Sequence, residues 1–345
     1  MTQELEHSQS VNQSMVQSVS VIVPCYNEEK TISLLLDAIY RQTYPRHLME
    51  VIIADGGSED QTRQRIAVFQ QSHPDLKVVL IDNPKRIIPA ALNRAIEASA
   101  GEIILRLDAH CVPAEDYVER SVSNLNKGVG ENVGGLWIIQ PGSQSWMGFS
   151  IAAAAANPLG VGDARYRYSH QMGEVDTVPF GAFRRSLIEK IGGFDETLLT
   201  NEDYEFNTRI RQNGGRVFFD PAIRSIYYAR PNLRSLAHQY WRYGYWKWRM
   251  LRRYPRSLRW RQFLPPLFVA GVSMLLVISL FWNAARFILS GVLAIYGLVL
   301  ILSAIPAAVQ RRKWFMIIGI PLAIATMHFC WGLGFLVSML RSLKS

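Results

Sequence analysis

The most informative absence in this 345-residue chain is that of acidic residues from its second part. Asp220 is the last acid, and the 125 residues after it carry 17 Lys and Arg, a net charge of +17. The first 220 residues carry 28 acids against 20 bases, a net charge of −8. The overall charge of +9 therefore combines two different environments, in a chain long enough for two domains.

Other absences exclude whole classes of protein. Cys25, Cys111 and Cys330 lie far apart without a CxxC pair, which argues against a disulfide framework and favours reduced thiols in the cytosol. Residues 1–18 have no apolar core, so we expect a disordered tail and no secretory signal peptide. A GxGxxG sequence is also missing, which argues against a nicotinamide or flavin enzyme.

Charge is missing from three long apolar segments, residues 263–282, 287–309 and 314–340. About 20 apolar helical residues cross a hydrocarbon core of roughly 30 Å. Trp260 and Trp314 lie near segment ends, where interfacial indoles belong. We therefore predict a membrane domain over residues 263–345 with about three transmembrane helices. The alternative, buried helices of a large soluble protein, fits the basic flanks poorly.

The basic residues also predict an orientation. The stretch RMLRRYPRSLRWR before the first apolar segment should stay in the cytoplasm. NAAR would then face outward and QRRK inward, whereas the C-terminal RSLKS would end outside, against the charge rule. Either one of the three segments is re-entrant and does not cross, or this tail is a weak exception to the charge rule. The expected location is the inner (cytoplasmic) membrane, as a multi-pass protein with its front domain in the cytoplasm.

The front part alternates short apolar runs with helical stretches. The runs are VSVIVP from Val19, VIIAD from Val51, VVLID from Val78 and EIILRLD from Glu102. Apolar strands without polar alternation, separated by helices of about 10–15 residues, are typical of a parallel sheet covered on both faces. We predict an α/β domain over residues 19–220, with ligands at the carboxyl ends of its strands.

Asp108 and His110 follow the fourth of these runs. Two side chains at positions i and i+2 beyond a strand end can reach one ion, and a carboxylate with an imidazole suits Mn²⁺ or a similar divalent ion that also binds phosphate oxygens. The plainer alternative is an Asp that caps a helix and a His that faces solvent.

Three further positions carry candidate chemistry. Tyr26, after the first strand, offers a ring face for a nucleobase, and Asp55, after the second, can accept hydrogen bonds from a base or ribose. Glu202 and Asp203 precede a helical stretch, where one could act as a general base. The alternatives are ordinary turn chemistry for the first two and stabilisation of the helix dipole for the acids.

Five motifs occur in a characteristic order over residues 19–254. They are VSVIVPCYNEE, IIADGGSEDQT, ILRLDAH, GAFRRSLIEKIGGFDE and NEDYEFNTRIRQNG. Together they resemble family 2 glycosyltransferases, most of all the membrane-attached glucosyltransferases of succinoglycan-type exopolysaccharide biosynthesis. The resemblance implies a GT-A fold, a Rossmann-like domain with a mostly parallel sheet, followed here by C-terminal transmembrane helices.

The resemblance also implies site residues. In the nucleotide pocket, Pro24, Tyr26 and Asn27 would line the walls and Asp55 would contact the base. For the metal and the chemistry, Asp108 and His110 occupy the positions of the DxD motif that hold Mn²⁺ or Mg²⁺ against the donor diphosphate. Asp203 would be the catalytic base and Glu202 its neighbour.

Two residues depart from the family pattern. Gly56 stands where many relatives have a second Asp, so one acid serves the base-binding turn. His110 replaces the last Asp of DxD, which should favour Mn²⁺ over Mg²⁺ because nitrogen ligands suit the softer ion.

The stretch 221–262 is basic and aromatic and joins the two parts. Its QYWRY resembles the QxxRW signature of membrane-bound relatives, which implies that Gln239 and Arg242 meet the donor diphosphate. The alternative is an interfacial helix whose cations meet lipid headgroups. Both readings can hold. Nucleic acid is not an expected partner, since the stretch directly precedes an apolar segment.

The predicted function is that of an inverting, metal-dependent hexosyltransferase. It would move a sugar from a nucleotide-diphosphate donor, a UDP-sugar, to a lipid-linked or glycan acceptor in exopolysaccharide or cell-surface glycan synthesis. Partners would be membrane lipids and other glycan-assembly proteins. The alternatives are a polyprenyl-phosphate glycosyltransferase, a catalytically inactive scaffold and a transporter subunit. The apolar segments contain no acid of the kind that coupled carriers often use.

Overall fold

The computed structural model describes residues 17–257 and 259–343 and contains two compact units. Unit 1 comprises the chain up to Ile138 and Ser169–Tyr227, and unit 2 comprises Ile139–Tyr168 and Tyr228–Ser345. The predicted disordered tail falls on residues 1–18, of which 1–16 lie outside the described residues. The sequence-based division into segments 19–220, 221–262 and 263–345 stays a prediction.

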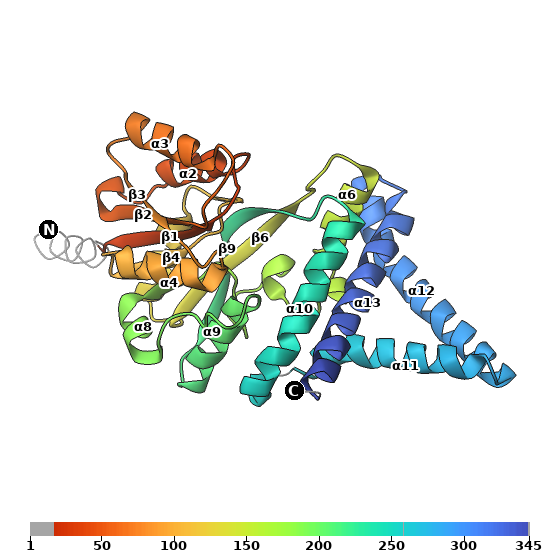
Figure 1. The fold of residues 1–345 in the computed structure, drawn as a ribbon. Helices are drawn as coiled ribbons and strands as arrows, with labels where there is room; N and C mark the ends of the chain where they lie inside the picture. The colour runs from red at the N-terminus through yellow and green to blue at the C-terminus, as the bar shows by residue number, and fades with distance from the viewer. Residues whose placement is uncertain (1–16, 258, 344–345) are drawn as a thin grey trace, which may run out of the picture. The chain divides into compact units, whose positions relative to one another are not determined.

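Nine strands form one mixed sheet in the described part of the chain (Figure 1). Its order is β3-β2-β1-β4-β8-β6-β9-β5, with β7 paired to β9. The first four strands are parallel, and β4–β8, β6–β8, β5–β9 and β7–β9 are antiparallel pairs. The strands are β1 (Val19–Cys25), β2 (Met49–Asp55), β3 (Lys77–Asp82), β4 (Ile103–Arg106), β5 (Cys111–Pro113), β6 (Asn132–Gln140), β7 (Gly173–Glu174), β8 (Ala182–Arg184) and β9 (Val217–Tyr228).

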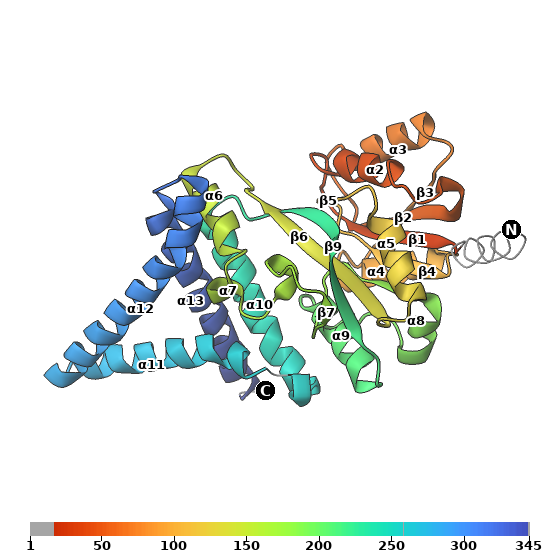
Figure 2. The same cartoon turned by 180° about the vertical axis from the view of Figure 1, so that it is seen from behind.

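Helices cover both faces of the parallel strands. Figures 1 and 2 both show α2 and α3 on one face and α4 on the other. The helices of unit 1 are α2 (Ile32–Tyr40), α3 (Thr62–Ser72), α4 (Ile88–Ala98), α5 (Tyr117–Asn126), α8 (Arg185–Ile191) and α9 (Glu202–Gln212). Every residue of β2 and β4 is buried, as expected for strands packed on both sides. The prediction of a Rossmann-like α/β domain is confirmed, and antiparallel strands extend its parallel core.

A buried acid secures the amino edge of this core. Glu50 on β2 accepts hydrogen bonds from Ser20 Oγ at 2.7 Å, from the Ala100 amide at 2.5 Å and from Lys77 Nζ at 2.7 Å. Burial raises the pKa of Glu50, but the Ala100, Lys77 and Ser20 donors outweigh it, and the pKa lies below its ordinary value. The ionised carboxylate therefore stabilises the fold.

Replacing Glu50 with Gln should destabilise unit 1 by about 1.5–3 kcal/mol at pH 7, the usual worth of hydrogen bonds to a charged group. A group whose pKa is lowered on folding contributes above its unfolded pKa and loses the contribution as pH falls through the folded value. The difference between wild type and Glu50→Gln in thermal unfolding should therefore shrink in acid. Glu97→Gln, exposed on α4, is the control and should change stability by less than about 0.5 kcal/mol. An equal, pH-independent effect of both variants would contradict this role.

Unit 2 is built from helices. They are α6 (Trp146–Ala154), α7 (Pro158–Val161), α10 (Leu233–Arg253), α11 (Leu264–Ser279), α12 (Asn283–Arg311) and α13 (Met316–Ser342). α6 packs closely on α13, because a Cβ on Gly319 would overlap Ser150 Oγ. An apolar cluster that includes Ile151, Tyr240, Leu300 and Ile320 joins α6, α10, α12 and α13. Among the described residues three stretches, Arg261–Ser279, Asn283–Arg311 and Met316–Ser342, are long and apolar enough to cross a membrane.

Candidate active site

The site residues of unit 1 gather where β1, β2 and β4 end. The register pairs Cys25 with Asp55 and Ile22 with Arg106, so the loops after these strands leave from one edge of the sheet. In open α/β sheets this edge is where ligands bind. Pro24 lies inside β1 opposite Ala54, one residue before the last residue of the strand.

Two loops at this edge are joined by hydrogen bonds. The Asn27 amide donates to Ser58 Oγ at 2.8 Å, and Asn27 Oδ1 accepts from the Glu59 amide at 2.9 Å. The Glu28 amide donates to Thr62 Oγ1 at 2.8 Å. Asn27 has φ = 53°, in the left-handed region that asparagine tolerates better than most side chains. Asn27 therefore shapes the predicted nucleotide pocket through the backbone it fixes.

Asp55 is fully buried and organises its own loop. Its carboxylate accepts from Ser58 Oγ at 2.5 Å, from the Ser58 amide at 3.0 Å and from Arg63 Nε at 2.5 Å. Burial raises the pKa of Asp55, but the Ser58 and Arg63 donors outweigh it and lower the pKa below its ordinary value. Asp55 is thus a fixed negative charge at the strand end, and contact with a base stays a prediction.

Tyr26 and Arg86 border the same loops. Tyr26 is 48% exposed, and a Cβ on Gly56 would lie 3.3 Å from its Cδ2, so glycine there lets the ring sit close to the backbone. Arg86 Nη2 lies 3.2 Å from the position of a Cβ on Gly57. A stacking surface and a cation therefore lie beside the loop after β2.

Asp108 and His110 lie in the tight turn between β4 and β5. β4 ends at Arg106, and the Cys111 amide donates to the Asp108 carbonyl at 3.1 Å. His110 Nδ1 lies 3.0 Å from Glu28 Oε1, and its ring centroid lies 6.4 Å from that of Tyr227. The turn thus brings both predicted ligands to the same edge, each with a charged neighbour.

Glu202 and Asp203 form the first turn of α9. Asn201, the residue before the helix, has φ = 71° and turns the chain so that the helix begins at Glu202. The amino end of a helix stabilises acids, which explains why three of them, with Glu205, stand in this turn. Glu202 is buried and Asp203 is partly exposed.

One buried arginine joins these acids to the β4–β5 turn. Arg106 is 3% exposed; its Nη2 lies 3.1 Å from Asp108 Oδ1 and 3.0 Å from Glu202 Oε1, and its Nη1 pairs with Asp203 Oδ1. The side chains of Asp108, Glu202 and Asp203 therefore all contact one guanidinium. We call these three residues the carboxylate cluster. Three carboxyl groups thus share the single positive charge of Arg106, which can balance only one of them.

This imbalance affects protonation. Burial raises the pKa of Asp203 well above its ordinary value; Glu202 and Asp108 add to the rise, and Arg106 opposes it. Burial opposes the charge of Arg106, but the carboxylate cluster outweighs it and raises the pKa of the guanidinium. Asp203 is thus a carboxylate whose affinity for a proton exceeds that of an ordinary aspartate.

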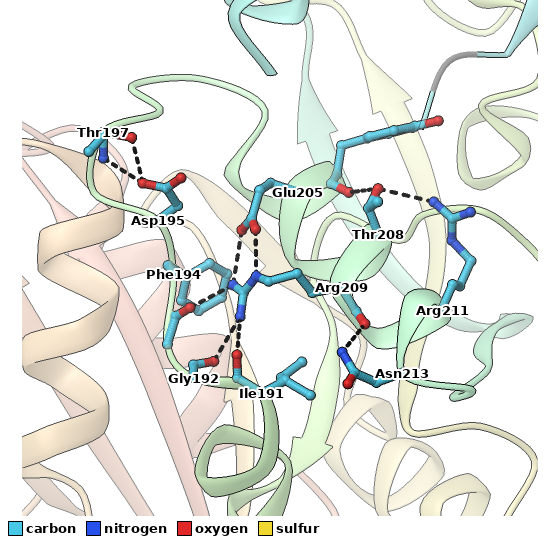
Figure 3. Close-up of polar contacts among 12 residues, drawn as sticks. Ile191, Gly192, Phe194, Asp195, Thr197, Glu205, Thr208, Arg209, Arg211 and Asn213 are labelled. Carbon is cyan, nitrogen blue, oxygen red and sulfur yellow. Dashed lines mark hydrogen bonds and ion pairs between the residues drawn. The ribbon is translucent and has the colours of Figure 1, made fainter. Parts of the chain in front are cut away.

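A second arginine holds α9 in place, as Figure 3 shows. Arg209 pairs with both oxygens of Glu205, at 2.5 and 2.9 Å, and donates to the carbonyls of Ile191 at 2.6 Å and Gly192 at 3.1 Å. Glu205 is fully buried. The GGF turn after α8 and the first turn of α9 are therefore fixed to each other.

The structure brings all eight predicted site residues of unit 1 to this edge: Pro24, Tyr26, Asn27, Asp55, Asp108, His110, Glu202 and Asp203. Gln239 and Arg242 lie on α10 of unit 2, where Gln239 Nε2 donates to Tyr243 Oη at 2.8 Å. Their contact with a donor diphosphate stays a prediction.

Sequence reasoning missed Arg106, Glu28 and Arg86. Arg106 had a signal, because an arginine inside an apolar strand must find partners when it is buried. Glu28 and Arg86 stand in loops, where charged residues are ordinary. Only the folded chain shows which partner each of these two side chains meets.

The residues present fit a divalent ion in two respects. The carboxylate cluster gathers more carboxyl groups than Arg106 can neutralise, and Glu28 orients the ring of His110, a nitrogen ligand, through Nδ1. Within residues 17–257 and 259–343, no group of three or more His, Cys, Asp and Glu side chains is arranged around a common metal position. One or two protein ligands suffice where substrate phosphates complete the coordination.

The sequence of this chain is similar to those of known proteins. The model of the family described as glycosyl transferase family 2 matches residues 20–192. Over 228 residues, 32% are identical to the succinoglycan biosynthesis protein ExoA of Rhizobium meliloti, covering 65% of this chain and 67% of that protein. Over 330 residues, 26% are identical to a dolichyl N-acetyl-α-D-glucosaminyl phosphate 3-β-D-2,3-diacetamido-2,3-dideoxy-β-D-glucuronosyltransferase of Methanococcus voltae, covering 94% and 97%.

The fold is similar to that of a solved mannosyltransferase from Pyrobaculum calidifontis in complex with GDP-mannose and Mn²⁺. The TM-score is 0.61 with 22% identity, over 90% of this chain and 87% of that one. At this identity the likeness concerns the fold alone.

Proposed function

Because the chain belongs to glycosyl transferase family 2, we propose that it transfers a hexose from a nucleotide-diphosphate donor, a UDP-sugar, with inversion at the anomeric carbon. The observation that carries the proposal is the carboxylate cluster on buried Arg106 at the carboxyl edge of the sheet. Through the Arg106 side chain, the cluster links Asp108, which is predicted to lie at the donor diphosphate, to Asp203, the predicted base.

The donor would lie against the loops after β1 and β2. Tyr26 supplies a ring for the base, and Asp55 supplies a charge held by its own loop. Arg86, beside Gly57, is a cation for a phosphate oxygen. Pro24 and Asn27 fix the backbone between these side chains.

Asp203 would act as the general base. It takes the proton of the acceptor hydroxyl, whose oxygen attacks the anomeric carbon while the bond to the diphosphate breaks. Its raised pKa makes it a stronger base than an ordinary aspartate. The carboxylate cluster contains no acid set apart as a nucleophile, and a single displacement inverts the configuration.

Asp108 and His110 would hold a divalent ion, Mn²⁺ or Mg²⁺. When bound, the ion offsets the negative charge that develops on the leaving diphosphate. The solved Pyrobaculum mannosyltransferase contains Mn²⁺, which supports the choice of metal class. Glu28, at 3.0 Å from His110 Nδ1, would orient the imidazole and select the tautomer.

Replacing Glu28 with Gln should weaken Mn²⁺ binding by about 10–100-fold in the presence of a nucleoside diphosphate, because the imidazole loses its carboxylate partner. Electron paramagnetic resonance of free Mn²⁺ measures this without turnover. Glu29→Gln, one residue along the same loop, is the matched control and should bind Mn²⁺ like the wild type. Equal Mn²⁺ affinity of Glu28→Gln and the wild type would show that Glu28 does not support metal binding through His110.

The acceptor we propose is a sugar already linked to a polyprenyl carrier at the cytoplasmic membrane face. The Methanococcus relative is named for such a lipid-linked acceptor, and the Rhizobium relative for exopolysaccharide synthesis. The apolar helices of unit 2 would keep the enzyme at the membrane beside other glycan-assembly proteins. Transfer onto polyprenyl phosphate itself is the second candidate.

Labelled donors and defined lipids separate these two candidates. With isolated membranes, label should enter lipid only when the polyprenyl diphosphate or phosphate already carries a sugar. Label on bare polyprenyl phosphate would favour the second candidate. Absence of label with every donor and lipid in the panel would contradict both.

A further inference from the structure

Helix α10 lies along helix α13 and covers one of its sides (Figures 1 and 2). A Cβ on Gly244 would overlap the carbonyl oxygen of Trp331, and a Cβ on Gly334 would overlap that of Trp241. Farther along the pair, Trp248 Nε1 donates to Ser342 Oγ at 2.8 Å. The glycines let the two backbones touch, so α10 and α13 move as one body.

Helix α10 carries exposed cations along its whole length. They are Arg234, Arg242, Arg249, Arg252 and Arg253. At 1.5 Å per residue, Arg234 and Arg249 lie about 22 Å apart along the axis, most of a hydrocarbon core of roughly 30 Å. A spanning α13 would carry these arginines into hydrocarbon, where charged side chains are strongly disfavoured.

The exposed residues of α13 also form one narrow stripe. Between Met316 and Leu340, all of which are described, only Ile318, Leu322, Leu333 and Leu340 are exposed. At about 100° per residue these four fall within an arc of about 60°. A helix with a single apolar stripe fits the surface of a bilayer, with one side in contact with lipid.

Helices α11 and α12 differ from α13. Only 17% and 11% of their most apolar stretches are buried, against 39% in α13. Phe281, in the turn between the two helices, is 87% exposed, and Phe287, near the start of α12, is 80% exposed. Apolar side chains that are exposed along most of both helices need a lipid environment.

The positive charges agree with two crossings. Arg261 precedes α11, and Arg311, Arg312 and Lys313 end or follow α12, so a hairpin places all of them on one side of the membrane. If α13 does not cross, Arg341 stays on that side too. Three crossings would place it on the opposite side, against the charge rule.

We propose that the chain crosses the membrane twice, through α11 and α12, and that α10 and α13 form a paired platform on the cytoplasmic bilayer surface. The apolar stripe of α13 contacts acyl chains, and the cations of α10 lie at the level of anionic lipid headgroups. The inference rests on the membrane attachment proposed above and not on the transfer reaction.

Cysteine labelling of the full chain in intact spheroplasts tests this topology. Single cysteines replace Ala284, Gln310 or Leu343, all exposed, after Cys25, Cys111 and Cys330 are changed to Ala. A membrane-impermeant maleimide should label Ala284→Cys from outside, and label Gln310→Cys and Leu343→Cys only after lysis. Ala284 and Gln310 serve as controls because two and three crossings place them alike, whereas Leu343 separates the two topologies.

Labelling of Leu343→Cys from outside would overturn the proposal in favour of three crossings. Labelling of Ala284→Cys only after lysis would overturn it in favour of a hairpin that does not cross. Recovery of the chain in the soluble fraction would refute membrane attachment itself. None of these outcomes depends on donor or acceptor, so a failure here is distinct from a failure of the transferase assignment.

Discussion

Replacing Asp203 with Asn should reduce kcat by about 10²–10⁴-fold, the usual contribution of a general base, and leave nucleotide binding almost unchanged. Asn keeps the size and hydrogen-bonding capacity of the side chain, so the contact with Arg106 can persist. It cannot take the proton of the acceptor hydroxyl. Steady-state transfer assays measure kcat, and calorimetric titration with the nucleoside diphosphate measures binding.

Glu202→Gln is the matched control, since Glu202 lies on the same helix turn and pairs with the same guanidinium at 3.0 Å. Asp203→Asn should lose much more activity than Glu202→Gln. A similar loss in both variants would mean that the cluster acts as a whole and that neither residue is the base. Lost nucleotide binding in Asp203→Asn would move Asp203 to the donor site.

The pH profile gives an independent check on Asp203. A base works only when deprotonated, and burial raises the pKa of Asp203. The activity of the wild type should therefore fall on acidification at a pH above the ordinary range of aspartate, which is about 4. In Asp203→Asn the residual activity should lack this acid limb. An unchanged limb in the variant would assign it to another group.

Replacing Arg106 with Met should destabilise unit 1 by about 3–5 kcal/mol, because three carboxylates would lose their shared cation. This corresponds to a fall in Tm on the order of 10 °C. Transfer activity should fall as well, since Asp108 and Asp203 would no longer be held together. Thermal unfolding of the purified full chain, with and without Mn²⁺ and nucleoside diphosphate, measures the change.

Arg106→Lys separates charge from geometry. It keeps a cation near the carboxylate cluster, so stability should recover in part, but an ammonium cannot present the guanidinium fork to three acids. Arg120 on α5 forms an exposed pair with Asp116, the residue before that helix, and Arg120→Met should cost less than about 1 kcal/mol. Similar Tm values for Arg106→Met and Arg120→Met would contradict the account of a charge cluster.

The parallel core was predictable from the sequence because its signals are local. Apolar runs such as VIIAD, bounded by Asp-Gly-Gly-Ser and followed by a polar helix, need no long-range information. The antiparallel strands were not predictable in the same way. β7 has two residues and β8 three, and both depend on partners far along the chain.

The positions of three candidate side chains were predictable from motif order: Asp55 and Asp108 follow strands, and Asp203 stands at the start of a helix. Their roles stay predictions. The site was not predictable where a side chain acts through a distant partner. Arg106 and Glu202 are 96 positions apart, and His110 and Glu28 are 82 apart. Tertiary packing alone brings those charges together.

The most direct test of the transferase assignment is a panel of labelled nucleotide sugars. Purified full-length protein would be incubated with each donor, polyprenyl-linked saccharides and Mn²⁺, and the labelled lipid quantified. We expect that one UDP-sugar gives a labelled lipid, that chelation of the metal abolishes this product, and that Asp203→Asn does not form it. Label that persists equally without divalent metal and in Asp203→Asn would contradict the account.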